Sequence, residues 1–247
     1  MIFRGLGLWV LFFVAGATFT LQGAGPAKSQ PQFCDLALVL AMDASSSVDP
    51  EEYKLQMDGI ASALLDPEVQ EAIMSLGGIY LAAFEWNGKH NQKVIFDWTF
   101  LKTNADLFSV ANGLTKHQRN ASNFPTAIGH ALAYASGMLK RLPVDCARKV
   151  IDVSGDGPNN DGFSPKSAYL HFPFENVTVN GLVIKDLYNN PESFYRDPER
   201  YYRDNVIKGG GAFLVLAEGF GDFARAMKQK LLKEIVPGPI GQLQQAE

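Results

Sequence analysis

Two short segments of the chain carry carboxylates and hydroxyls at a spacing that could bind a cation. Asp43-Ala44-Ser45-Ser46-Ser47 follows the apolar run 36–42, and Ser154-Gly155-Asp156-Gly157 follows the run 149–153. Side chains at i, i+2 and i+4 of an extended segment point to one side, so the oxygens of Asp43, Ser45 and Ser47 can converge. Asp156 adds a second carboxylate in a tight turn flanked by glycines.

A third segment adds another hydroxyl, because Thr126 stands at the start of a predicted helix, after Asn123-Phe124-Pro125. The three segments together offer two carboxylates and three hydroxyls, with no His and no Cys. Such an oxygen-only set suits Mg²⁺, Mn²⁺ or Ca²⁺ and does not suit zinc. Each piece also has an ordinary structural interpretation, since Ser, Thr and Asp after strands often serve as helix caps and turn residues.

Alternating strands and helices must position these segments. The run 36–42 is apolar without a break, which predicts a strand buried on both faces of a parallel sheet. Asp49-Pro50-Glu51-Glu52 has the pattern of a helix start, and an apolar stripe follows to Leu64. Further strands are predicted at 79–84, 94–100, 149–153, 177–184 and 212–217, and further helices at 104–114, 126–141 and 223–235.

The predicted fold is α/β: a single, doubly wound, mostly parallel six-stranded sheet flanked by helices. The short, turn-rich connection 87–91 predicts a hairpin, and hence one antiparallel edge strand. In such a sheet ligands bind beyond the carboxyl ends of the strands, where the strand order reverses. The three polar segments follow elements that this topology directs toward one site.

Composition excludes several classes of protein. The chain has 247 residues, 47% of them hydrophobic and 19% charged, which argues against a disordered chain. Its 22 basic and 26 acidic residues give a net charge of −4 without a dense Lys/Arg block, so nucleic-acid binding is not expected.

The beginning of the chain has the pattern of a secretory signal peptide. Arg4 precedes an apolar run from Gly5 to Ala17, and small residues follow. We therefore predict a signal peptide over 1–27, a short linker over 28–33, a domain over 34–236 and a tail over 237–247. The expected location is exported, periplasmic or secreted, with no stable membrane insertion after cleavage; an uncleaved anchor is the alternative.

Cys34 and Cys146 are the only cysteines, and each comes just before a predicted strand. In an exported protein an isolated pair is more often bridged than reactive. If the two strands are parallel neighbours, both cysteines lie at the same end of the sheet and a disulfide is geometrically reasonable. Two free buried thiols are the alternative.

The three polar segments resemble the metal-ion-dependent adhesion site (MIDAS) of von Willebrand factor A (vWA) domains. That motif reads D-x-S-x-S, then a Thr, then an Asp before Gly. The resemblance implies a metal set of Asp43, Ser45, Ser47, Thr126 and Asp156. It also implies a divalent cation, foremost Mg²⁺ with Mn²⁺ or Ca²⁺ possible, and a protein partner whose acidic side chain fills the open coordination position.

More narrowly, the secreted one-domain layout is similar to a bacterial vWA-like family of unknown function, with a cysteine before the first strand and a Val-Ser-Gly-Asp-Gly turn. One departure is Phe124-Pro125 before Thr126, where vWA domains commonly have glycines, which predicts a stiffer loop. The polar stretch 159–163 could supply extra ligands or partner contacts.

The expected function is an exported protein-binding module and not an enzyme. The alternatives are a metal-dependent hydrolase or phosphotransferase using the same site, and a structural domain whose site is vestigial. The chain has no Asp-x-Asp start, no G-x-S-x-G elbow and no phosphate loop with lysine. The four histidines are interpreted as surface or structural residues: His90, His117, His130 and His171. The aromatic run 194–203 predicts a surface helix, with a partner-binding face as the sharper alternative.

Overall fold

A computed structural model describes Met1 and residues 34–120, 123–185 and 197–236 of the chain. Apart from Met1, the signal peptide, the linker and the tail that the sequence predicts lie outside the described residues, and they stay predictions. The helices and strands described below all belong to the unit Phe33–Glu247.

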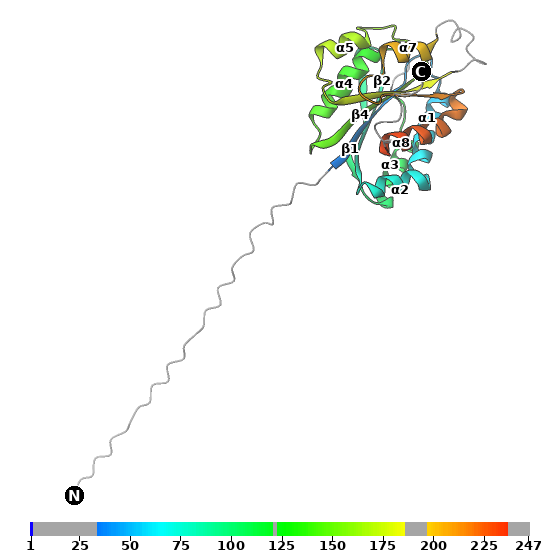
Figure 1. Ribbon diagram of the computed structural model, residues 1–247. Coiled ribbons are helices and arrows are strands. Elements are labelled where there is room, and N and C mark those ends of the chain that lie inside the picture. Colours follow the sequence, from blue (N-terminus) through cyan, green and yellow to red (C-terminus); the bar gives the residue numbers. More distant parts are fainter. Residues whose placement is uncertain (2–33, 121–122, 186–196, 237–247) are drawn as a thin grey trace, which may run out of the picture. The chain divides into compact units, whose positions relative to one another are not determined.

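The core of this unit is a six-stranded sheet in the order β3-β2-β1-β4-β5-β6 (Figure 1). Neighbouring strands are parallel except for the β2–β3 hairpin, which leaves β3 as an antiparallel edge strand. This confirms the predicted α/β fold. The strands are β1 Cys34–Asp43, β2 Ile79–Asn87, β3 Asn91–Leu101, β4 Cys146–Gly155, β5 Val177–Ile184 and β6 Leu214–Ala217.

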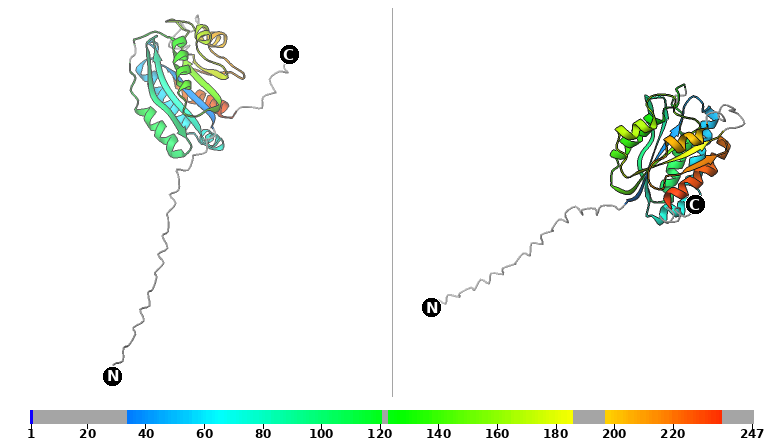
Figure 2. Two further views of the ribbon diagram at one scale, coloured as in Figure 1. Left: turned by 90° about the vertical axis from the view of Figure 1, so that its left-hand side faces the viewer. Right: turned by 45° about the horizontal axis from the view of Figure 1, so that its top comes forward.

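Helices cover both faces of the sheet (Figure 2). One layer holds α1 Pro50–Leu64, α2 Pro67–Ser75, α3 Asn104–Lys116 and α8 Phe223–Ile235. The other holds α4 Ile128–Lys140, α5 Pro165–His171 and α7 Pro198–Asn205. The sequence analysis missed the short helices α2 and α5.

Strand β1 is buried on both faces, as its unbroken apolar run predicts. Leu36, Leu38, Leu40 and Met42 belong to the core under α1, α3 and α8, whereas Val39 and Ala41 belong to the core under α4 and α7. Because side chains alternate along a strand, Asp43 lies on the same face as Val39 and Ala41. Asp49 then starts α1 with the predicted capping box, accepting hydrogen bonds from the backbone N–H groups of Glu51 and Glu52.

Strands β1 and β4 form the point where the strand order reverses. The chain leaves β1 to reach β2 on one side, and it leaves β4 to reach β5 on the other. In an open α/β sheet the carboxyl ends of such a strand pair border the usual ligand site. Asp43 is the last residue of β1, and Asp156 directly follows the last residue of β4.

Cys34 and Cys146 form a disulfide at the opposite end of these two strands, with a Cα–Cα distance of 4.5 Å. Both cysteines are the first residues of their strands and are direct neighbours in the β1–β4 register. The predicted bridge is therefore confirmed, although the cysteines lie inside the strands and not just before them. The bridge closes a separation of 112 residues, which stabilises the domain by about 4 kcal/mol through the lost entropy of the unfolded chain.

A fully buried charge cluster holds α8 against the sheet. The ammonium of Lys230 lies 2.9 Å from Asp152 Oδ1 on β4 and 2.5 Å from Glu234 Oε1 one helical turn later. Asn180 on β5 donates a hydrogen bond of 2.9 Å to the same Glu234 oxygen. Two carboxylates share one ammonium here, and burial raises the pKa of Asp152 to about 7.

Candidate metal centre

The loop after β1 begins with a tight turn around the Asp43 carboxylate. Oδ1 of Asp43 accepts a hydrogen bond of 2.7 Å from the backbone N–H of Ser45, and the N–H of Val48 donates to the Ser45 carbonyl at 3.0 Å. Asp43 and Ser45 are completely buried, whereas Ser47 is exposed. The turn therefore runs from the core outward, with its polar side chains at successive depths.

A chain of hydrogen bonds connects the three predicted segments. Thr126 Oγ1 lies 3.3 Å from Ser45 Oγ, which lies 3.2 Å from Ser47 Oγ. Ser47 Oγ in turn donates to Asp156 Oδ1 at 2.9 Å. The structure thus brings Ser45, Ser47, Thr126 and Asp156 together directly, and Asp43 joins them through the backbone of Ser45.

The other carboxylate oxygen of Asp43 decides whether a cation fits. Asp43 Oδ2 is buried and has no hydrogen-bond partner among the residues that the structure describes. Burial, and next the charge of Asp156, raise the pKa of Asp43 well above its usual value. A bound cation would compensate both effects, because an adjacent positive charge favours the ionised carboxylate. The oxygen-only donor set therefore fits a hard divalent cation.

Backbone contacts from the stretch after Asp156 hold Thr126 in place. Asn160 Oδ1 accepts from the Thr126 N–H at 2.8 Å, and the N–H groups of Asn160 and Asp161 donate to the Thr126 carbonyl at 2.9 and 3.1 Å. Asn159 Oδ1 accepts from the N–H of Gly129 in the first turn of α4, at 3.1 Å. This polar stretch, in which the sequence suggested extra ligands, orients Thr126 and caps α4.

Thr126 does not cap its own helix. The N-cap of α4 is Ala127, which has no capping side chain, so the Thr126 hydroxyl is available to Ser45. The preceding Phe124-Pro125 segment is tied down by its carbonyls, which accept from the N–H of Ser46 at 2.8 Å and the N–H of Gly88 at 2.6 Å. The loop that the sequence predicts to be stiff is thus anchored at both residues.

Arg119 is a site residue that the sequence analysis missed. Its guanidinium donates three hydrogen bonds of 2.6 Å to the loop after β1, one each to the carbonyls of Ala44, Ser45 and Val48. The guanidinium also lies over the ring of Tyr53, 5.6 Å from the ring centroid. No spacing rule connects Arg119 to the loop, because more than seventy residues separate them.

A buried carboxylate organises the segment that carries Arg119. Glu85 on β2 is buried and accepts hydrogen bonds from the Tyr53 hydroxyl and from the backbone N–H of Asn120, the latter at 2.8 Å. His117 Nε2 lies 3.3 Å from the same carboxylate. His117 therefore packs beside the site as a structural residue, as the sequence interpretation expected of the histidines.

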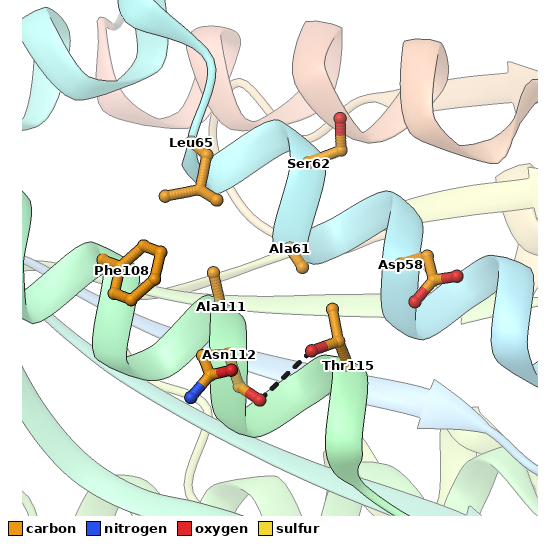
Figure 3. A pocket seen from close by; sticks show the side chains of 8 residues that line it. All are labelled: Asp58, Ala61, Ser62, Leu65, Phe108, Ala111, Asn112 and Thr115. Atoms are coloured by element: carbon orange, nitrogen blue, oxygen red, sulfur yellow. Dashed lines mark hydrogen bonds between the residues drawn. The ribbon is translucent and has the colours of Figure 1, made fainter.

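A shallow groove elsewhere on the surface contains none of the five candidate ligands. It lies between α1 and α3, holds about 280 Å³ and is mostly apolar (Figure 3). Among the described residues, no group of three or more His, Cys, Asp or Glu side chains is placed to hold a metal. A cation at the β1–β4 edge would therefore depend on hydroxyl oxygens. The groove is lined by Asp58, Ala61, Ser62, Leu65, Phe108, Ala111, Asn112 and Thr115.

Solved structures share this fold at low sequence identity. Proximal thread matrix protein 1 from the mussel byssus, in a structure with a zinc-occupied MIDAS motif, is 16% identical; the match covers 81% of this chain and 48% of that one, with a TM-score of 0.55. A von Willebrand factor type A protein from Catenulispora acidiphila is 14% identical, with coverages of 82% and 43% and a TM-score of 0.55. BatB from Bacteroides thetaiotaomicron is 16% identical, with coverages of 81% and 98% and a TM-score of 0.51.

The chain thus spans less than half the length of the first two proteins and nearly all of BatB. At these identities the likeness shows the fold, which is vWA-like. A comparison with curated protein sequences found no match. A family model described as "Protein of unknown function (DUF1194)" matches residues 33–239. Because this match covers most of the chain, the protein belongs to the DUF1194 family and has a vWA-like fold.

Proposed function

We propose that this domain binds a divalent cation through Asp43, Ser45, Ser47, Thr126 and Asp156, and that the bound ion engages a protein partner. Mg²⁺ is the expected ion, with Mn²⁺ and Ca²⁺ as alternatives, because all five side chains offer oxygen. The observation that carries the proposal is the buried Oδ2 of Asp43, which has no hydrogen-bond partner in the described part of the chain.

The donor set also supports a role in adhesion. Three of its five members are neutral hydroxyls, so the set would only partly neutralise a divalent charge and would favour an additional anionic ligand. A carboxylate on the surface of a partner protein has the right chemistry for that position. The mussel thread matrix protein, whose MIDAS is zinc-occupied, supports the idea that this fold can hold a divalent ion there.

Calorimetric titration of the metal-stripped protein with Mg²⁺, Mn²⁺ and Ca²⁺ tests the site. We expect saturable binding in the wild type and its loss in Asp43→Ala and Thr126→Ala, with the fold preserved by circular dichroism. Asp145→Ala is the matched control, because its side chain is 88% exposed and precedes β4 at the far end of the sheet. Binding that survives in Asp43→Ala would refute the proposed ligand set.

Partner binding needs a separate measurement. The wild-type protein is used to capture partners from a cell-envelope extract of the source organism. We expect a chelator to release the captured proteins, and we expect Asp43→Ala to capture none of them. Capture that is insensitive to both the chelator and the substitution would exclude a metal-bridged contact. If the wild type binds no cation with or without a carboxylate ligand such as acetate, the evidence favours the alternative of a structural domain with a vestigial site.

We also infer that the protein is exported. The pattern of residues 1–27 and the Cys34–Cys146 disulfide support this, since disulfides persist in oxidising compartments. In the described part of the chain, no helix is long and apolar enough to cross a membrane. N-terminal sequencing of the protein from fractionated cells should give a start near residue 25 or 28; an intact Met1 would contradict signal cleavage.

A further inference from the structure

The helix α7 contributes a tyrosine to the interior of the candidate site. The aromatic run 194–203 predicts a surface helix. The structure has α7 there, packed on the sheet face that also carries α4 and α5. Tyr202, however, has 0% of its surface exposed and belongs to the core under α4 and α7. The predicted surface helix is therefore present over Pro198–Asn205, but the side chain of Tyr202 packs against the sheet and away from solvent.

Two glycines form the slot that admits this side chain. A Cβ atom added to Gly181 on β5 would lie 2.9 Å from the Tyr202 ring, and one added to Gly155 on β4 would lie 2.4 Å from its hydroxyl oxygen. Because real Cβ atoms do not approach so closely, only glycine leaves room at Gly155. The ring therefore crosses the sheet face from β5 to β4, and its hydroxyl ends beside the last residue of β4.

The same point of the slot borders the Asp43 carboxylate. The Cβ position of Gly155 that lies 2.4 Å from the Tyr202 hydroxyl also lies 2.8 Å from Asp43 Oδ2. The two oxygens can be separated by no more than the sum of these distances. That upper limit, about 5.2 Å, is within reach of one bridging water molecule, and a shorter separation inside it allows a direct hydrogen bond.

Both oxygens are unpaired in the described part of the chain. The Tyr202 hydroxyl and Asp43 Oδ2 are buried, and neither hydrogen bonds to any residue that the structure describes. Leaving a buried polar group unsatisfied is costly, and nearly all such groups in folded proteins are paired. A phenol has a proton to donate, and a carboxylate oxygen has two lone pairs, so Oδ2 can accept from the Tyr202 hydroxyl and still have a lone pair for a cation.

We propose that Tyr202 is a positioning residue for Asp43, its hydroxyl donating to Oδ2 directly or through one water molecule. The Ser45 N–H holds Oδ1 from the other side, so the carboxylate is fixed at both oxygens. The consequence for cation binding rests on the proposed function. The pairing itself does not, because it is argued from the packing of Tyr202, Gly155 and Asp43 and from their unpaired oxygens.

Tyr202→Phe in the full-length protein tests the proposal, because the variant keeps the ring in its slot and removes only the hydroxyl. Hydrogen bonds to a ligating carboxylate typically change metal affinity by about 10- to 100-fold. We therefore expect Mn²⁺ affinity, measured by calorimetry, to fall at least about tenfold. Tyr169→Phe is the matched control: the hydroxyl of this partly buried tyrosine donates to the carbonyl of Val206 on the same face of the sheet. It should lower the thermal midpoint and leave Mn²⁺ affinity unchanged.

A double-mutant cycle separates this proposal from the proposed function. Thermal unfolding without metal is measured for Tyr202→Phe, Asp43→Ala and the double variant. We expect the losses of unfolding free energy in the two single variants not to add up to the loss in the double variant. If the wild type binds no cation but the cycle shows coupling, the proposed function fails and the pairing stands.

Two results would overturn the proposal. Additive effects in the metal-free cycle would show that Tyr202 does not act on Asp43. Unchanged Mn²⁺ affinity in Tyr202→Phe, with a wild type that binds Mn²⁺, would show that the pairing does not position the ligand. An affinity loss together with additive effects would mean that the hydroxyl acts on the ion without Asp43.

Discussion

Replacing Arg119 by methionine should loosen the loop that carries the first three candidate ligands. The guanidinium donates 2.6 Å hydrogen bonds to the carbonyls of Ala44, Ser45 and Val48. A hydrogen bond to a charged group contributes about 1.5–3 kcal/mol when it is buried. Because Arg119 is only half-buried, water can replace part of each bond, and we expect a net loss of about 2–4 kcal/mol.

Thermal unfolding followed by circular dichroism measures this loss. For a domain of this size each 1 kcal/mol shifts the midpoint by about 2–4 °C, so Arg119→Met should unfold about 5–15 °C below the wild type. Arg119→Lys should recover only part of the difference, since an ammonium cannot reproduce the planar fork.

Arg141→Met serves as the control, because Arg141 is exposed and, among the described residues, its guanidinium donates only to the carbonyl of Gly137 in the preceding helix α4. A shift for Arg119→Met no larger than that of Arg141→Met would refute the idea that the guanidinium holds the loop.

Two further predictions concern the sheet. Burial raises the pKa of Asp152 to about 7, so the folded state holds this proton more tightly than the unfolded chain does; the associated stability is complete below about pH 4 and is lost as the pH rises through 7. Asp152→Asn should therefore flatten the fall in unfolding free energy between pH 5 and 8 in urea titrations, and an unchanged slope would contradict the assignment. Gly155→Ala should cost about 1–3 kcal/mol by forcing overlap in the tyrosine slot. Gly157→Ala, whose Cβ would meet nothing within 4 Å, should cost far less; equal costs would count against the slot.

Hydrophobic periodicity and helix-capping patterns in the sequence predicted most of the strands and helices of the fold. The strand at 177–184 and the helix at 223–235 have the predicted bounds, and the 87–91 turn gives the antiparallel hairpin. The missed helices α2 and α5 begin with Asp66-Pro67 and Ser164-Pro165, which repeat the Asp49-Pro50 signal of α1. They were missed because a stretch of nine or seven residues is too short for an apolar stripe to be evident.

Local sequence also predicted where the candidate ligands lie, because a motif directly after a strand is located at the end of that strand. Asp43 and Asp156 end neighbouring parallel strands, so the topology alone sends them to one edge of the sheet. Their role as metal ligands remains a prediction. The residues that orient the ligands come from distant segments: Arg119 on the loop after α3, and Asn160 after β4.

The sequence by itself determined the alternation of strands and helices, the polar ends of β1 and β4, and the cysteine pair at the opposite end of those strands. Only the tertiary structure decided that Arg119 donates hydrogen bonds to the loop after β1 and that the Tyr202 ring lies over two glycines, with its hydroxyl toward Asp43. The physical reason is the distance along the chain over which each effect acts. Backbone preferences and side-chain periodicity act between near neighbours in the chain, whereas the burial of a hydroxyl or a guanidinium depends on which remote segments pack around it.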